Sequence, residues 1–411
     1  MKWTNKGHQY DEIGKHFVNV NRIYLYGASD RGIEALQQLS FTDIPIIFID
    51  RSDEKQNQGF QGHKVISPAQ FYREYNDIKS IVILTMDSYL RAKRNLLSMG
   101  LRDGIEVFDW KFFNEFYIHI YAMYRHEKLH ITFTCEWITN KCTLTCKNCV
   151  QFIDILPEIS KTYEQVVNDI DTLFSTVDYL GTMYMQGGEL TLHANCVDLI
   201  NYVLDNYSSR FVDFYIFTNG VWPKSLERKS FFKALTRPKA HIYWSDYSEN
   251  VNDNIRAKIH ENIESARQHG VDVLRFVPHW IDIGDGNFEE HSEDWHIDRF
   301  NDCQVNFNAH DNKVARCTQS YEWAQRVFGD DYLTHIEEDW IYLKFDDYTK
   351  AISDSDREKD KKLMHKRIML ETYLGYTESG YTEMCAYCRG WLGVNNTSIP
   401  AGVQRKRKCP K

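Results

Sequence analysis

Apolar and polar positions follow a regular alternation over the first part of the chain. Short, fully apolar runs at 22–26, 46–49 and 81–85 are separated by segments with helical spacing, such as 33–39. Strands that are apolar on both faces, with helices between them, are typical of a parallel sheet covered on both sides. We therefore predict a small doubly wound α/β domain over residues 1–112, followed by an aromatic-rich linker helix at 113–130.

The turn after the first predicted strand carries candidate ligand-binding groups. Gly27 and Gly32 are spaced G-x-x-x-x-G, and Asp50 ends the second strand. Helix amides at such a turn can bind a phosphate, and a strand-end acid can bind a ribose. On spacing alone, ligand binding and a purely structural turn are equally open. The segments 25–29, 48–50 and 62–68 resemble the N-terminal nucleotide-sugar-binding domain of bacterial sugar acyltransferases, which implies a Rossmann-like domain.

Composition narrows the class of protein. The net charge of -9 argues against a general nucleic-acid binder. No apolar run is long enough to span a membrane, and no signal segment follows Met1, so we expect a cytoplasmic protein with reduced thiols. Its 10 cysteines are then candidate metal ligands. Residues 396–411 are predicted to form a solvated basic tail.

Three cysteines follow the strand predicted at 131–139. Cys142, Cys146 and Cys149 have C-x-x-x-C-x-x-C spacing. A short loop with this spacing can wrap three corners of a cubane iron–sulfur cluster. A structural zinc ion would need a fourth ligand, and none lies nearby in the sequence. The fourth iron would therefore be open to a cofactor.

This motif resembles that of the radical S-adenosylmethionine superfamily. The resemblance implies a partial (β/α)6 barrel over residues 131–300, with the cluster at the carboxyl ends of its strands. It also implies that the open iron chelates S-adenosylmethionine, whose reductive cleavage gives a 5′-deoxyadenosyl radical that abstracts a substrate hydrogen. A flavodoxin- or ferredoxin-type protein would supply the electron.

Further strand ends match the family in the expected order. Their implied cofactor-binding residues are Gly187, Gly188 and Glu189, then Thr218 and Asn219, then Ser245 and Asp246. Glu189 would neutralise the cofactor's ammonium group. Asn148 stands where the family usually has an aromatic residue, and Phe152 is the candidate substitute at the adenine.

Four later cysteines form a second candidate site. Cys303, Cys317, Cys385 and Cys388 resemble the twitch domain, a shortened relative of the SPASM domain, over residues 301–395. That resemblance implies a second, fully ligated [4Fe-4S] cluster with a role in electron transfer. Zinc on four thiolates is the alternative. The role of the insertion at 318–384 is open.

Three cysteines and one aromatic segment remain, and one of these cysteines, Cys409, lies in the basic tail. Cys135 and Cys196 are expected in the core, although either could donate a hydrogen atom to a substrate radical. Trp280, Asp282 and Gly284 form a W-x-D-x-G segment that resembles one in radical S-adenosylmethionine proteins encoded with surface-polysaccharide enzymes. Loop packing is an equally good explanation for it.

These observations leave three functions to weigh. The leading prediction is an enzyme that oxidises or epimerises a carbinol carbon of a small-molecule substrate, a carbohydrate, glycan or nucleotide sugar. The second is a maturase that modifies a ribosomal peptide, and the third is a non-enzymatic metal-binding adaptor. The strand–helix alternation of the first domain disfavours the maturase, because such enzymes often carry a winged-helix leader-binding domain.

Overall fold

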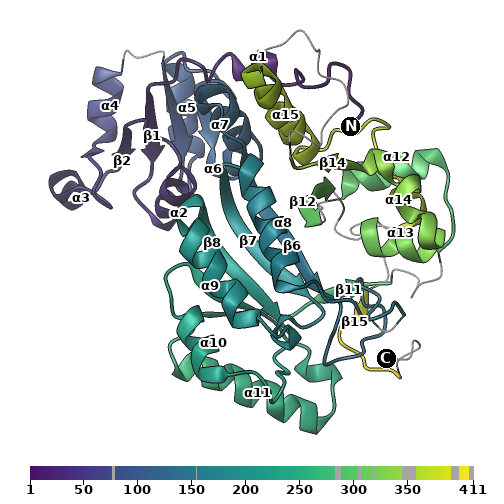
Figure 1. The fold of residues 1–411 in the computed structure, drawn as a ribbon. Coiled ribbons are helices and arrows are strands. Elements are labelled where there is room, and N and C mark those ends of the chain that lie inside the picture. Colours follow the sequence, from purple (N-terminus) through teal and green to yellow (C-terminus); the bar gives the residue numbers. More distant parts are fainter. Residues whose placement is uncertain are drawn as a thin grey trace.

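The computed structural model describes residues 1–411 except 76–78, 154, 283–287, 304–306, 311, 316, 318–319, 345–357, 390–397 and 407–411. Gly284 and the end of the basic run at 407–408 lie outside the described residues. A parallel sheet and a second, mostly parallel sheet, joined by a helical segment, form the framework of the described chain (Figure 1). None of the described helices is both long and apolar enough to cross a bilayer.

The first sheet has the strand order β3-β2-β1-β4-β5, and every pairing in it is parallel. Its strands are β1 (Arg22–Tyr26), β2 (Ile46–Ile49), β3 (Val65–Ile66), β4 (Ser80–Leu84) and β5 (Val107–Asp109). The helices are α1 (Asp11–Gly14), α2 (Asp30–Gln38), α3 (Asp53–Gln58), α4 (Pro68–Glu74) and α5 (Leu90–Ser98). The three predicted apolar runs are strands β1, β2 and β4, shifted by one residue at most.

A helical segment connects the two sheets. It comprises α6 (Trp110–Phe112), a π-helical turn (Phe113–Tyr117) and α7 (Ile118–His126). Most of α7 is buried because it packs against α1 on one side and against β6 and α15 on others. The predicted linker helix is thus present, although it begins and ends a few residues earlier than expected.

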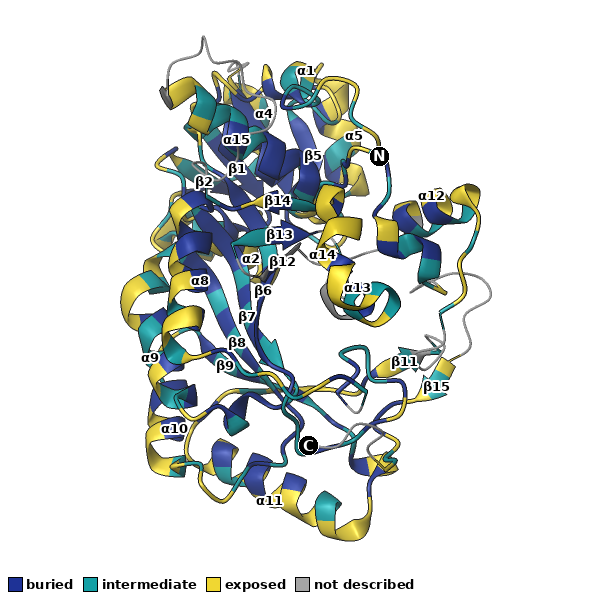
Figure 2. Cartoon of the chain, turned by 45° about the vertical axis from the view of Figure 1, so that its right-hand side comes forward, coloured by how far each residue is buried: buried dark blue, intermediate teal, exposed yellow. Residues whose placement is uncertain are grey.

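The second sheet has the strand order β10-β9-β8-β7-β6-β12-β13-β14. Five parallel strands run in chain order: β6 (His130–Thr139), β7 (Tyr179–Gly187), β8 (Phe211–Thr218), β9 (Ala240–Ser245) and β10 (Val273–Phe276). One face is covered by α8 (Tyr163–Thr176), α9 (Cys196–Tyr207), α10 (Arg228–Leu235) and α11 (Asp253–Gln268), which expose their outer sides (Figure 2).

The sixth parallel strand is not where a simple (β/α)6 repeat puts it. After β10 the chain forms β11 (His279–Ile281), which pairs with β15 (Ser398–Pro400) in a separate two-stranded sheet. The sixth parallel strand is β12 (Phe307–His310), and it joins the opposite edge of the sheet beside β6. The antiparallel strands β13 (Lys313–Ala315) and β14 (Trp340–Tyr342) then extend that edge.

Residues 301–395 contribute to several parts of the molecule. Besides β12–β14, they include α13 (Ser320–Phe328), α14 (Tyr332–His335) and a 3-10 helix (Glu383–Tyr387), which α12 (Glu293–Asp302) contacts. In contrast, α15 (Glu358–Tyr373) returns to α7 (Figure 1). Its Glu371 carboxylate accepts hydrogen bonds from Trp3 Nε1 and from the backbone N–H groups of Gly7 and Gln9. Part of the predicted auxiliary region therefore stabilises the N-terminal end of the chain.

Candidate functional site

The loop that carries the first three cysteines is held against the end of β7 by two backbone hydrogen bonds. Gly188 N donates to Thr139 O and Glu189 N donates to Lys141 O, each at 2.7 Å. A Cβ atom at Gly187 would lie 2.3 Å from Thr139 O, and one at Gly188 would lie 2.2 Å from Lys141 O. Only glycine permits this approach of two backbones. The glycine pair therefore fixes where the cysteine loop begins.

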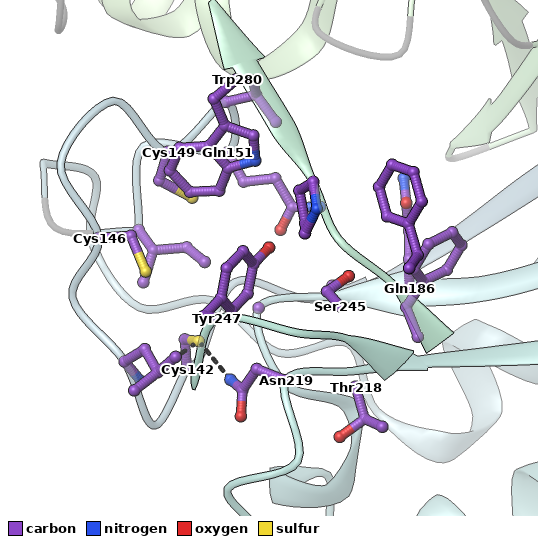
Figure 3. Close-up of a pocket in the computed structure, with 18 of the residues that line it drawn as sticks. Cys142, Cys146, Cys149, Gln151, Gln186, Thr218, Asn219, Ser245, Tyr247 and Trp280 are labelled. Carbon is purple, nitrogen blue, oxygen red and sulfur yellow. Dashed lines mark hydrogen bonds between the residues drawn. The ribbon is translucent and has the colours of Figure 1, made fainter. Parts of the chain in front are cut away.

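The three thiols face one cavity of about 230 Å³. Figure 3 shows Cys142, Cys146 and Cys149 along one side, Ser245, Thr218 and Gln186 on the other, and the Tyr247 ring between them. Predicted residues in the lining are Cys142, Cys146, Cys149, Gly187, Gly188, Thr218, Asn219, Ser245 and Trp280. The cavity lies at the carboxyl ends of the parallel strands, where ligands bind in open α/β sheets.

The electrostatics of the loop reflect crowded, buried thiols. Burial, and next the neighbouring Cys146 thiol, raise the pKa of Cys142 well above its ordinary value. Asn219 Nδ2 donates to Cys142 Sγ at 3.4 Å, and Leu144 N donates to the same sulfur at 3.5 Å. Burial and the Cys146 and Cys149 thiols likewise raise the pKa of Tyr247. Tyr247 thus lies close to the cysteine loop, as well as lining the cavity.

The donor set fits a cluster better than a single ion. In the described ranges, no three His, Cys, Asp or Glu side chains converge on one point that could hold a metal ion. An iron–sulfur cluster instead takes each thiolate on a separate iron. Three thiols along one side of a shared cavity, with two hydrogen-bond donors directed at the Cys142 sulfur, suit that arrangement.

Glu189 does not line the cavity, in contrast to the prediction that it meets the cofactor. Its side chain is fully buried, and its carboxylate accepts hydrogen bonds from Thr218 Oγ1 at 2.9 Å and from Asn219 N at 2.9 Å. Thr191 also donates to it through its hydroxyl at 2.7 Å. Burial raises the pKa of Glu189, while these hydrogen bonds oppose the rise. Glu189 therefore connects the end of β7 to the end of β8.

Ser245 and Asp246 face different surroundings. Ser245 lines the cavity, whereas Asp246 does not. Asp246 Oδ2 accepts from Arg275 Nε at 2.7 Å, and its Oδ1 accepts from Ser248 N at 2.9 Å. Asp246 is thus held by Arg275 and Ser248, and its predicted contact with the cofactor stays a prediction.

Phe152, the predicted substitute for the aromatic residue at the adenine, does not line the cavity. Phe152 is 1% exposed and packs against Phe288 and Trp323, with ring centroids at 5.6 and 6.1 Å. Its neighbours Gln151 and Ile153 line the cavity instead. Asn148 has a φ of +58°, in the left-handed region that asparagine tolerates better than an aromatic residue. The backbone at this position explains the unusual residue.

The second group of cysteines is partly assembled. Burial raises the pKa of Cys385 to about 12, and the nearby Cys317 and Cys388 thiols add to that rise. Thr382 Oγ1 lies 3.2 Å from Cys385 Sγ. Trp295 Nε1 of α12 donates to Cys388 O at 3.0 Å, and Cys303 follows that helix directly. The Cys317 and Cys388 thiols thus lie near Cys385, and Cys303 follows α12, which contacts the 3-10 helix that carries Cys385.

Cys196 and Cys135 differ in their position relative to the sheet. Cys196 begins α9 and belongs to the core between sheet and helices, where burial and Glu189 raise its pKa. Cys135 lies on β6 in register with Tyr184 on β7, and it is 1% exposed. Neither lines the cavity. Both positions agree with the expectation of buried thiols, and only Cys135 neighbours the aromatic face described next.

The face of the second sheet opposite its helices carries a row of aromatic rings that the sequence analysis missed. Tyr184 stacks on Tyr215 at 5.4 Å and contacts Phe217 at 5.0 Å, and Phe217 contacts Tyr243 at 4.6 Å. Tyr243 in turn contacts Phe276 at 5.4 Å. All five are at least partly exposed, and Phe217 and Phe276 also line the cavity. Aromatic residues at alternate positions of β8, Tyr215 and Phe217, were the available signal.

In the first sheet, the candidate ligand-binding groups are bonded to one another. Asp50 Oδ2 accepts from Ala28 N at 2.9 Å, and Asp50 Oδ1 accepts from Ser52 N at 2.9 Å. Ser29 Oγ donates to Thr85 O at 2.8 Å. The acid predicted to bind a ribose therefore ties together the loops after β1 and β2.

Comparisons with known proteins leave the function to be argued from this site. No protein-family model matches the chain, and no curated protein matches it. Parts of the fold resemble Streptococcus suis SuiB bound to the precursor peptide SuiA, at 15% identity over 39% of this chain and 36% of that one, with a TM-score of 0.28. For SuiB bound to S-adenosylmethionine the identity is 14% over 46% of this chain and 45% of that one, with a TM-score of 0.28. The chain thus spans less than half of the structures it matches.

Proposed function

We propose that this chain is a radical S-adenosylmethionine enzyme with one [4Fe-4S] cluster on Cys142, Cys146 and Cys149. The observation that carries the proposal is the shared cavity of these thiols, the glycine pair and the ends of β8 and β9. When bound, the cluster and S-adenosylmethionine would supply a 5′-deoxyadenosyl radical that abstracts a hydrogen atom from the substrate. Asn219 would orient the Cys142 sulfur, and Glu189 would hold the Thr218–Asn219 strand end in place.

We further propose that Cys303, Cys317, Cys385 and Cys388 bind a second [4Fe-4S] cluster that serves electron transfer. The proposal is supported by the neighbouring thiols of Cys317, Cys385 and Cys388 and by the packing of α12 on the 3-10 helix that carries Cys385. Four thiolates would ligate every iron, leaving none for the substrate.

Anaerobic reconstitution tests both cluster sites. We expect about eight irons per chain and formation of deoxyadenosine from S-adenosylmethionine and dithionite. Cys142→Ala should halve the iron content and abolish deoxyadenosine formation. The double variant Cys385→Ala/Cys388→Ala should also halve the iron content but retain deoxyadenosine formation. Cys196→Ala is the matched control, because this buried cysteine lies outside the cavity and should change neither value. Absence of iron, or zinc alone without cofactor cleavage, would refute the proposal.

For the substrate, we propose a carbohydrate or nucleotide-linked sugar that is oxidised or epimerised at a carbinol carbon. The support is the aromatic face from Tyr184 to Phe276, which continues into the cavity. Aromatic side chains with a few polar groups, here Gln186 and Ser245, are typical of small-molecule sites. In an epimerisation, Cys135 is the candidate hydrogen donor, since it neighbours Tyr184.

Deuterium transfer identifies the substrate class. Nucleotide sugars deuterated at single carbinol positions would be incubated with the reconstituted protein, and deuterium in deoxyadenosine would mark the abstracted hydrogen. Tyr184→Leu should raise KM about tenfold, a loss of roughly 1.4 kcal/mol of binding. Tyr207→Leu is the control, since Tyr207 stacks on Phe174 of helix α8 on the other side of the sheet. Transfer from peptides but never from sugars would favour a maturase.

A further inference from the structure

Gln404, more than 250 residues after the cysteine loop, forms an isolated antiparallel β-bridge with Cys146 of that loop. Lys147 N donates to Val403 O and Arg405 N donates to Thr145 O, each at 2.8 Å. Just before this point, β15 pairs with β11, with Ile399 opposite Trp280. We call residues 398–406 the C-terminal strap. The basic run was expected in solvent, yet Arg405 belongs to the strap and bonds the cysteine loop.

Two contacts seat the strap on the cavity wall. Asn250 Nδ2 donates to Ala401 O at 2.8 Å. Gly402 has a φ of +80°, and a Cβ atom there would lie 2.6 Å from Tyr247 Cβ and 2.7 Å from the Tyr247 ring. Tyr247 lines the cavity that contains the three thiols. A side chain at residue 402 would therefore push the strap away from the cavity wall.

The amide of Gln404 is held in one orientation. Its Oε1 accepts from Thr145 N at 2.8 Å, and a backbone N–H can only donate. The oxygen must therefore face Thr145, so the NH2 group faces Cys146 Sγ at 3.1 Å. The same nitrogen donates to Gly402 O at 2.6 Å. Both amide hydrogens thus have acceptors, one of which is a predicted cluster ligand.

We propose that Gln404 is a positioning residue for the cluster, and that the strap holds in place the cysteine loop and Tyr247, which line the cluster site. This inference rests on the function proposed above. One-electron reduction of the cluster by an external reductant adds negative charge without making or breaking a bond, and hydrogen bonds to the thiolate sulfurs stabilise that charge. Gln404 at Cys146 and Asn219 at Cys142 would therefore raise the reduction potential of the cluster.

A redox titration tests the role of Gln404. The reconstituted full chain would be titrated while following the electron paramagnetic resonance signal that changes on addition of S-adenosylmethionine. Gln404→Leu should retain the wild-type iron content and shift the midpoint potential to a more negative value. Val403→Ala is the matched control, because Val403 contributes its backbone carbonyl to the loop and its side chain is 36% exposed. A wild-type potential in Gln404→Leu would overturn the role of Gln404.

A second measurement tests the strap without any cluster. In the metal-free protein, alkylation of Cys146 by iodoacetamide would be followed by mass spectrometry, with circular dichroism to verify folding. Gly402→Ala should accelerate labelling of Cys146 severalfold and leave labelling of Cys196 unchanged. An unchanged rate at Cys146 would overturn the role of the strap in holding the cysteine loop. Failure of the wild-type chain to bind iron, with accelerated labelling in Gly402→Ala, would instead refute the proposed function and retain the strap.

Discussion

The two sheets place similar groups at the carboxyl ends of their parallel strands, but these groups have different surroundings in each sheet. In the first sheet, Asp50 and Ser29 bond the backbones of neighbouring loops. In the second sheet, Glu189 does the same for the end of β8, yet Gly187 and Gly188 let the cysteine loop approach and a cavity remains. A strand-end acid therefore indicates a ligand site only when neighbouring groups leave space for the ligand.

The largest expected effect comes from glycine substitutions in the two sheets. Gly188→Ala would put a Cβ atom 2.2 Å from Lys141 O, and Gly32→Ala would put one 2.5 Å from Gly27 O. Both should lower the free energy of unfolding by about 1–3 kcal/mol, as overpacking does. Deoxyadenosine formation per folded molecule should fall at least 100-fold, about 2.7 kcal/mol, in Gly188→Ala only. Equal losses of activity in both variants would remove the distinction between the sheets.

Removing the strand-end acids gives the next effect. Glu189→Ala leaves Asn219 N without its acceptor beside the cysteine loop, so we expect roughly a 10- to 100-fold loss of cofactor cleavage. Asp50→Ala should cost about 1–3 kcal/mol of stability, because Ala28 N and Ser52 N lose their acceptor. Its cleavage rate should equal that of wild type. Chemical denaturation and a deoxyadenosine assay on the same samples separate the two results.

The connection between the sheets is expected to be sensitive to acid. Burial lowers the pKa of His119 to about 4, so the folded protein binds fewer protons than the unfolded chain between pH 4 and 6.5. Stability is therefore lost as the pH falls through this window, by up to about 1.4 kcal/mol per pH unit. His119→Gln should flatten this part of the stability curve, as measured by urea denaturation at several pH values. An unchanged slope would show that His119 does not cause it.

The smallest effect is expected at Asp246. Its partner Arg275 is 55% exposed in its side chain, so solvent screens the ion pair. Arg275→Gln should change stability by less than about 1 kcal/mol and leave cofactor cleavage unchanged. A large loss of cleavage would mean that Asp246 acts in the site after all.

Local patterns in the sequence predicted the strands and the cysteine loop well. The runs at 22–26 and 46–49 are strands β1 and β2, and such mostly apolar parallel strands can be recognised without knowing their neighbours. Gly187 and Gly188 were found because they follow a predicted strand and resemble the G-G-E motif of the family. The packing of Phe152 on Phe288 and Trp323 and the ion pair of Asp246 with Arg275 were not predicted, because they join segments that are distant in the sequence.

Contacts between segments that are distant in the sequence were not predicted. The bond from Gln404 to Cys146 joins residues 258 positions apart, and nothing in a basic run predicts it. The placement of β12 beside β6 and the return of α15 to α7 are likewise set by packing between distant segments. Such contacts depend on the complete fold, so composition and spacing carry no signal for them.

The strap also has a consequence for the order of synthesis. Because Gln404 follows Cys146 by 258 residues, a ribosome adding about 5–20 residues per second makes the cysteine loop roughly 13–50 s before the strap. During that interval the cysteine loop lacks the strap, and its thiols are accessible both to iron delivery and to oxidants. The strap would then pack against a loop that had already encountered iron or an oxidant.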